Sequence, residues 1–179
     1  AHNGNRGDAT DVFDGATYVS FTPYTNPNTN AYNGPNPSTD TLQNVPTHFA
    51  VVNIHKDPND PSVMRADFIF NYWSGEIAEN TTWSNDPYGN PVYVGGDVIV
   101  PEGVTLTIQP GTKVMFATSD ASSGGWDSDR CELIVQGKLL AEGTSSDPIT
   151  FQSVNGGTAK DEWYGIVFSS TADDASVVK

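Results

Sequence analysis

The sequence predicts an all-β chain that ends in a short right-handed parallel β-helix. Two observations carry this prediction: a strand pattern recurs with a period of 32 to 35 residues, and apolar residues alternate by two within each copy. One copy is too thin to bury its own apolar face, so copies are expected to stack into a continuous core. The copies are DVIVPEGVTLTIQPGTKVMF (97–116), CELIVQGKLLAEGTSSDPITF (131–151) and EWYGIVF (162–168).

Each rung of this β-helix is expected to consist of three strands, with turns at the Pro-Gly, Glu-Gly and Asp-Pro dipeptides. The segment VTLTI (104–108) would point its aliphatic side chains inward and its threonines outward. Two to three rungs are predicted within residues 76–179. The register is predicted from three sets of similar residues: Ile99 with Ile134 and Ile166, Leu106 with Leu139, and Phe116 with Phe151.

Residues 1–75 predict a loop-rich β segment ahead of the β-helix. The first 47 residues are dominated by Asn, Thr, Pro, Gly and Asp with scattered aromatics, a composition typical of an irregular segment that wraps over a β core. Two strand patterns then follow, HFAVVNI and VMRADFIF, joined by the polar turn KDPNDPS. They predict a β-hairpin over about residues 48–70.

The strings VPEGVTLTIQPGTKVMF, ELIVQGKLLAEGTSSDPITFQS and WYGIVF resemble the opening rungs of pectate-lyase-like parallel β-helices in large secreted and surface proteins of bacteria. The resemblance spans about residues 76–179. It implies an extracellular or cell-surface location. It implies no particular activity, because the same scaffold carries lyases, hydrolases, adhesins and purely structural arrays.

Residues 3–70 resemble the C-terminal end of the catalytic domain of M6-type secreted metalloproteases, through GNRGDATDVFDG, SFTPYTNPNTNAYNG and the hairpin ending in MRADFIF. The zinc motif HExxH of that family is absent, since the histidines are His2, His48 and His55. This resemblance implies a segment without the catalytic part. Because the pattern starts within one domain and stops within a rung, we expect the chain to belong to a longer protein.

Composition narrows the possible partners. Lys and Arg number 8 against 22 Asp and Glu, which gives a net charge of −14 and argues against nucleic acid as a partner. No apolar run approaches membrane-spanning length, so no membrane insertion is expected. The single cysteine, Cys131, excludes an internal disulfide and opens an apolar strand, which predicts a buried structural thiol.

A first candidate site consists of Asp8, Asp11 and Asp14 in the segment GDATDVFDG. Several carboxylates in a glycine-containing loop suit Ca²⁺, the one cofactor that the sequence suggests. The spacing of three differs from that of an EF-hand loop, whose ligands alternate by two. The alternative is that these aspartates cap turns.

A second candidate site is the insertion SDASSGGWDSDR, residues 119–130, which lengthens the first rung. Long loops on one side of a β-helix are where binding clefts form, and we name this loop as a possible ligand contact. With so few rungs there is little groove for a polymer, so no catalytic residue is predicted. The main expectation is a solvated loop with its tryptophan over the rung edge. The candidate residues are Asp120, Trp126, Asp127, Asp129 and Arg130.

These observations predict a non-catalytic, extracellular structural or adhesive module. An uncapped β-helix end exposes strand edges, so Phe168, Val177 and Val178 are predicted to meet more of the same polypeptide or a second copy. Two alternatives stay open. One is a processed fragment or targeting domain of an M6-like metalloprotease, and the other is a carbohydrate-binding or polysaccharide-lyase-like β-helix with surface polysaccharide as its partner.

Overall fold

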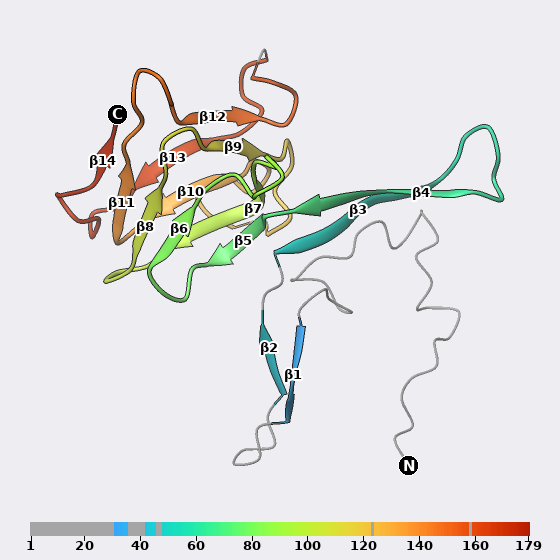
Figure 1. Cartoon of the computed structure of the whole chain (residues 1–179), viewed down its shortest axis with the longest axis horizontal. Helices are drawn as coiled ribbons and strands as arrows, with labels where there is room; N and C mark the ends of the chain where they lie inside the picture. The colour runs from blue at the N-terminus through green and yellow to red at the C-terminus, as the bar shows by residue number, and fades with distance from the viewer. Residues whose placement is uncertain (1–30, 36–41, 46–47, 123, 158) are drawn as a thin grey trace. The chain divides into compact units, whose positions relative to one another are not determined.

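The computed structural model describes residues 31–35, 42–45, 48–122, 124–157 and 159–179 (Figure 1). Every regular element in these ranges is a β-strand. The described residues contain no helix long and apolar enough to cross a membrane. The chain divides into two compact units, residues 1–69 and 70–179, which we describe separately. The candidate calcium ligands Asp8, Asp11 and Asp14 lie outside the described residues.

The described residues of the first unit form two pairs of strands. β3 (Phe49–Lys56) and β4 (Met64–Phe70) form the predicted hairpin. Its turn is fixed by Asp57, whose carboxylate accepts a hydrogen bond from the Asn59 amide (2.7 Å) and pairs with Arg65.

β1 (Ala31–Pro35) and β2 (Leu42–Val45) form a short antiparallel pair inside the segment that was expected to be irregular. The strings AYNGP and LQNV show no alternation of apolar and polar residues, so the sequence pattern does not reveal them.

The second unit is a short parallel β-helix, as predicted. Strands that are far apart in sequence pair in parallel and build two sheets, in the orders β12-β9-β7-β10-β13 and β14-β11-β8-β6, with β5 also paired to β7 (Figure 1). Successive turns of the chain therefore stack on one another. The strands are β5 (Tyr72–Glu76), β6 (Thr81–Trp83), β7 (Val92–Val100), β8 (Thr105–Ile108), β9 (Lys113–Phe116), β10 (Glu132–Val135), β11 (Lys138–Ala141), β12 (Thr150–Ser153), β13 (Gly165–Phe168) and β14 (Val177–Val178).

β7 belongs to two rungs at once. Its first part, Val92–Val94, pairs with β9, whereas its last part, Val98–Val100, pairs with β10. The chain changes direction between these parts at Gly95, Gly96 and Asp97. The corner of the solenoid at this point holds the candidate site described below.

The register confirms part of the predicted alignment. Ile99 pairs with Ile134, and Leu106 pairs with Leu139. Phe151 pairs with Val114 instead of Phe116, a shift of two that leaves the inward and outward faces unchanged. The third isoleucine is also misplaced: Ile166 pairs with Leu133, and Val167 takes the place beside Ile134.

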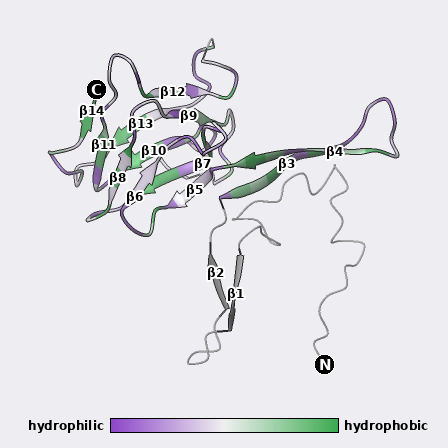
Figure 2. Ribbon diagram, viewed as in Figure 1, coloured by the Kyte–Doolittle hydropathy of each residue, from purple (hydrophilic) through white to green (hydrophobic). Residues whose placement is uncertain are grey.

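The core consists of rows of side chains that repeat from rung to rung. In the first sheet Val100 and Val135 are fully buried neighbours, and in the second Ile108 and Ala141 are buried at the paired position. Much of β7, β10 and β13 carries hydrophobic residues (Figure 2). The next members of the two rows are Phe168 and Val178, which remain 46% and 48% exposed because no described strand follows them.

Candidate functional site

Four acidic residues gather where β7 turns toward β10, and we call this group the acidic corner: Asp97, Asp120, Asp127 and Glu132. Asp97 and Glu132 occupy equivalent positions in consecutive rungs, because the residues that follow them, Val98 and Leu133, are paired. The Glu132 amide donates a hydrogen bond to Asp97 Oδ1 over 2.9 Å. Both residues are buried, with exposed fractions of 3% for Asp97 and 0% for Glu132.

The loop between β9 and β10 folds back onto this corner through Asp120. The Asp120 carboxylate accepts hydrogen bonds from the amides of Asp97 (3.1 Å), Ser122 (2.9 Å) and Gly124 (3.0 Å). The Ser122 hydroxyl also accepts from the Asp97 amide over 2.8 Å. Asp120 therefore joins the loop to the solenoid.

Glu132 holds the second part of the loop. Its carboxylate oxygens accept from the Trp126 amide over 3.1 and 2.9 Å. Gly125 has a positive φ of 65°, and a Cβ added there would overlap Glu132 Oε2 and lie 2.7 Å from Asp97 Oδ2. The loop backbone thus lies directly against both carboxylates, and only glycine fits there.

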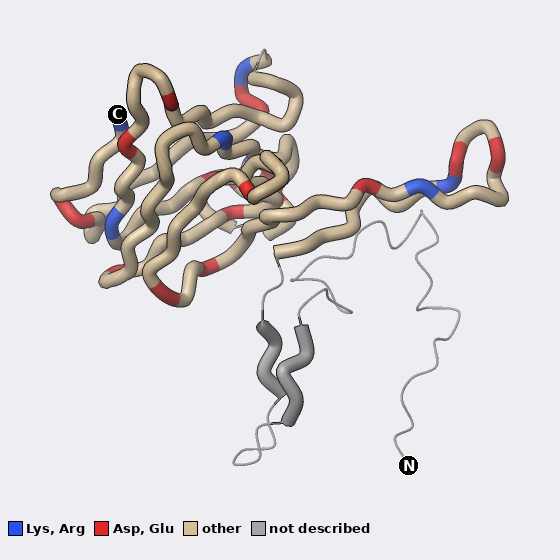
Figure 3. Tube along the Cα trace, in the orientation of Figure 1, with Lys and Arg blue, Asp and Glu red and all other residues tan. Residues whose placement is uncertain are grey.

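Asp97 is the least satisfied member of the acidic corner. Its Oδ2 atom is buried and has no hydrogen-bond partner. Burial, followed by the negative charges of Asp120, Glu132 and Asp127, raises the pKa of Asp97 from its ordinary value of 3.8 to about 6. The acidic residues of the solenoid outnumber its cations (Figure 3).

Arg130 is the cation of this loop, and it is already engaged elsewhere. It forms ion pairs with Asp127 (2.7 Å) and Asp161 (3.6 Å), and its guanidinium lies 5.1 Å from the ring centre of Tyr164. The hydrogen bonds and charge of Arg130 lower the pKa of Asp127. The positive charge of Arg130 therefore offsets the negative charge of Asp127, and it is not paired with the buried carboxylates of Asp97 and Glu132.

A model of the family described as "Pectate-lyase like beta helix domain" matches residues 75–176, more than half of the chain. The chain belongs to this pectate-lyase-like family. The match contains the whole acidic corner and excludes residues 1–74, so the resemblance to M6-type metalloproteases receives no support from it. No curated protein and no solved structure matches the chain.

The predicted loop of this pectate-lyase-like chain divides into inward and outward residues. Asp120 and Asp127 lie in the acidic corner, whereas the Asp129 side chain forms no hydrogen bond with another described residue. Trp126 is 70% exposed. The expectation that Trp126 covers the edge of a rung is not confirmed: its amide donates to Glu132, and the residue is largely exposed.

Asp97 and Glu132 were missed by the sequence analysis. A signal for them was present: in the register that aligns Ile99 with Ile134, each acid precedes an aliphatic run, in DVIV and in ELIV. Among the described residues of this pectate-lyase-like domain, no three His, Cys, Asp or Glu side chains stand close enough to enclose a metal ion by themselves.

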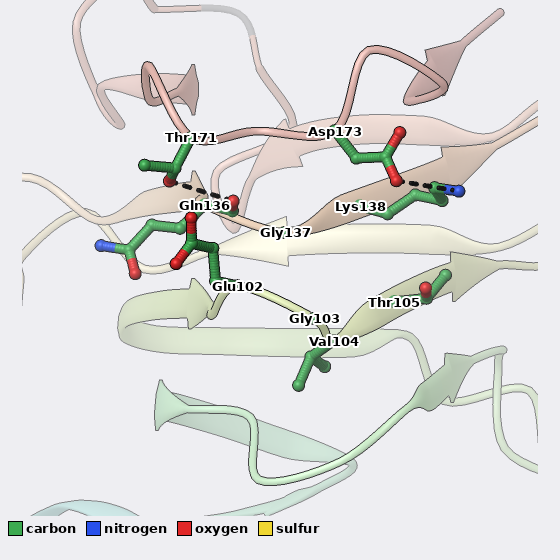
Figure 4. A pocket seen from close by; sticks show the side chains of 9 residues that line it. All are labelled: Glu102, Gly103, Val104, Thr105, Gln136, Gly137, Lys138, Thr171 and Asp173. Carbon is green, nitrogen blue, oxygen red and sulfur yellow. Dashed lines mark hydrogen bonds and ion pairs between the residues drawn. The ribbon is translucent and has the colours of Figure 1, made fainter.

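A concave region of the pectate-lyase-like domain lies apart from the acidic corner, where the turns between paired strands stack, and its volume is about 320 Å³ (Figure 4). Its charges are largely neutralised, because Lys138 pairs with Asp173 over 3.0 Å. The Thr171 hydroxyl donates to the Gln136 carbonyl over 3.1 Å, which further closes the wall. The lining residues are Glu102, Gly103, Val104, Thr105, Gln136, Gly137, Lys138, Thr171 and Asp173.

Cys131, beside the acidic corner, is buried and donates a hydrogen bond to the Ser119 carbonyl over 3.3 Å. Burial, and then the charges of Asp120 and Asp97, raise its pKa to about 12. We therefore expect the thiol not to react with Ellman's reagent at pH 8 until urea unfolds the chain. Labelling of the folded protein at the rate of a free cysteine would contradict this placement.

Proposed function

We propose that this pectate-lyase-like β-helix is a non-catalytic structural or adhesive module of a larger extracellular or cell-surface protein. The observation that carries the proposal is the exposure of two core positions in the last rung. Phe168 continues the buried row of Val135, and Val178 continues that of Ala141, yet each is nearly half exposed. Core rows of this kind are completed by a further rung.

The main chain of the last rung supports the same proposal. Within the described residues, β13 pairs only with β10 and β14 only with β11, so each has one strand edge without a strand partner. Such edges are templates for another strand. Val177 pairs with Leu140 in the outer row and would contribute its backbone instead of a core side chain.

One corner of this end is already covered. The ring of Trp163 stacks on Phe116 with 4.1 Å between ring centres and 13° between planes. A further rung is therefore proposed to cover Phe168 and Val178, and to come from a longer form of the same polypeptide or from a second copy.

The positions of the acids support a non-catalytic role. An acid–base catalyst must come within hydrogen-bond reach of its substrate. Asp97 and Glu132 are 3% and 0% exposed, and Asp127 is bound by Arg130. These carboxylates hold the loop in place and do not face a polymer in solution.

The test of this function combines two measurements. In sedimentation velocity runs over a wide concentration range, we expect the 179-residue chain to self-associate. A double variant, Phe168→Glu with Val178→Glu, should be monomeric, because charged side chains would have to be buried beneath the added rung. Tyr88→Glu is the matched control, since Tyr88 is 92% exposed in a turn, and it should associate like the wild type.

The second measurement is the intact mass of the native protein in its own host. A longer polypeptide would identify the added rung as its own continuation, and an HExxH peptide upstream would support the M6 alternative. A native polypeptide of 179 residues that is monomeric at every concentration would overturn the proposed stacking.

A further inference from the structure

We propose that the acidic corner binds a divalent cation, with Ca²⁺ the fitting ion, through the carboxylates of Asp97 and Glu132. This inference goes beyond the structural role proposed above and is independent of it. It assigns a site to two residues inside the β-helix, apart from Asp8, Asp11 and Asp14.

The first argument is the buried oxygen of Asp97. Oδ2 has no hydrogen-bond partner, although the residue is only 3% exposed. Oδ1 of the same carboxylate accepts from the Glu132 amide, so the carboxylate is held in a fixed orientation. A buried polar atom without a partner is rare in folded proteins and points to a bound group.

The second argument is the direction in which this oxygen points. A Cβ added to Gly124 would lie 3.2 Å from Asp97 Oδ2, and one added to Gly125 would lie 2.7 Å from it and against Glu132 Oε2. The two carboxylate oxygens therefore lie against the same stretch of loop backbone at Gly125. The same Oε2 of Glu132 accepts a hydrogen bond from the Trp126 amide over 2.9 Å, which fixes its position.

The third argument is the charge. Asp120 and Asp127 add to the negative field at Asp97, while Arg130 is paired with Asp127 and Asp161. Buried carboxylates without a counter-charge are costly, and a bound cation removes that cost. The corner thus attracts a positive charge that none of its own side chains supplies to Asp97.

The chemistry of the corner favours calcium over smaller ions. Ca²⁺ accepts six to eight oxygen ligands in adaptable geometry, including carboxylates, carbonyl groups and water. Two protein carboxylates would be completed by water and loop carbonyls. Mg²⁺ demands a near-ideal octahedron and retains its waters, so it should bind more weakly.

Thermal unfolding tests this site. At pH 7.5, after chelation, addition of Ca²⁺ at about a hundred times its Kd should raise the Tm of the wild-type chain by roughly 5–10 °C, and Mg²⁺ should raise it less. Asp97→Asn should remove the response to Ca²⁺. Asp129→Asn is the matched control, because the Asp129 side chain lies in the same loop and is hydrogen-bonded to none of the residues that the structure describes, and it should respond like the wild type.

A second readout does not depend on stability. Tb³⁺, a luminescent substitute for Ca²⁺, should show sensitised emission when the four tryptophans are excited, and Ca²⁺ should displace it. Trp126→Phe should abolish most of the sensitised emission while leaving the Tm response to Ca²⁺ intact. If Asp97→Asn fails to show a β-sheet circular dichroism spectrum, Glu132→Gln serves as the second variant.

Three outcomes would overturn the proposal. One is a wild-type Tm that Ca²⁺ does not change. Another is an equal Ca²⁺ response in folded Asp97→Asn or Glu132→Gln, which would place the ion elsewhere in the chain. The last is a Tm that rises on acidification without any response to Ca²⁺, which would show that the corner takes up only a proton.

Discussion

Replacing Gly137 by alanine is expected to lower the free energy of unfolding by about 3 kcal/mol, at the upper end of the range for overpacked sites. A Cβ at this position would overlap the main-chain carbonyl oxygens of Pro101 and Val104 in the preceding rung. Backbone atoms cannot rotate away as a side chain can. The rungs would have to separate, which strains the hydrogen bonds from the Gly137 amide to Val100 (2.9 Å) and from the Lys138 amide to Val104 (2.9 Å).

Urea unfolding followed by circular dichroism measures this effect. Gly103→Ala provides the control: Gly103 has a φ of +79°, and a Cβ there would meet no atom within 4 Å. Gly103→Ala should lower the free energy of unfolding by about 1 kcal/mol, because an alanine is strained at a positive φ even where no atom is in its way. Equal losses in the two variants would show that the close approach between rungs is not what requires glycine at position 137.

Asp97→Asn is expected to raise the free energy of unfolding at pH 7, in the presence of a chelator, by as much as about 3 kcal/mol. The folded wild type keeps an ionised carboxylate in a buried corner next to Asp120 and Glu132, which is why its pKa rises from 3.8 to about 6. Asparagine carries no charge. Its Oδ1 can still accept from the Glu132 amide, and its neutral Nδ2 takes the place of the buried oxygen that has no hydrogen-bond partner.

The pH dependence of stability isolates this effect. Because the pKa of Asp97 is higher in the folded chain than in the unfolded chain, the unfolded chain loses its proton first as the pH rises. The contribution of Asp97 therefore destabilises the fold progressively from about pH 4 to about pH 6 and stays constant above that.

The gain from Asp97→Asn should follow the same course: small at pH 4 and complete at pH 7, in urea titrations at intermediate values. Asp129→Asn should retain the wild-type profile. A gain that does not change with pH would refute the raised pKa.

The sequence predicted the β-helix because stacked rungs require apolar strands that recur at a regular period. It predicted the pairing of individual residues only where a single alignment of the apolar residues was possible. Leu106 and Leu139 were aligned correctly. Phe151 was placed two residues away from its partner Val114, because a shift of two preserves the alternation that the prediction relied on. The run GIVF has no alternation at all, which explains the misplaced Ile166.

The candidate site was predicted in part. The loop composition pointed to Asp120 and Asp127, and both lie in the acidic corner. Asp97 and Glu132 were missed because each opens a strand in which the neighbouring side chains are aliphatic and buried. Composition does not show that an acid will be enclosed there, since acids are rarely fully buried. That information depends on how the loop folds back over the corner.

Because of β7, resistance to local unfolding is expected to differ along the solenoid. It passes from one rung into the next without a loop, and it is hydrogen-bonded to β5, β9 and β10. Local unfolding of β13 or β14 would leave the hydrogen bonds of β7 to β5 and β9 intact. Unfolding of β7 would break its pairing with three strands at once. The early rungs are therefore expected to unfold together as one cooperative unit, whereas the last rung can open locally at a lower free energy.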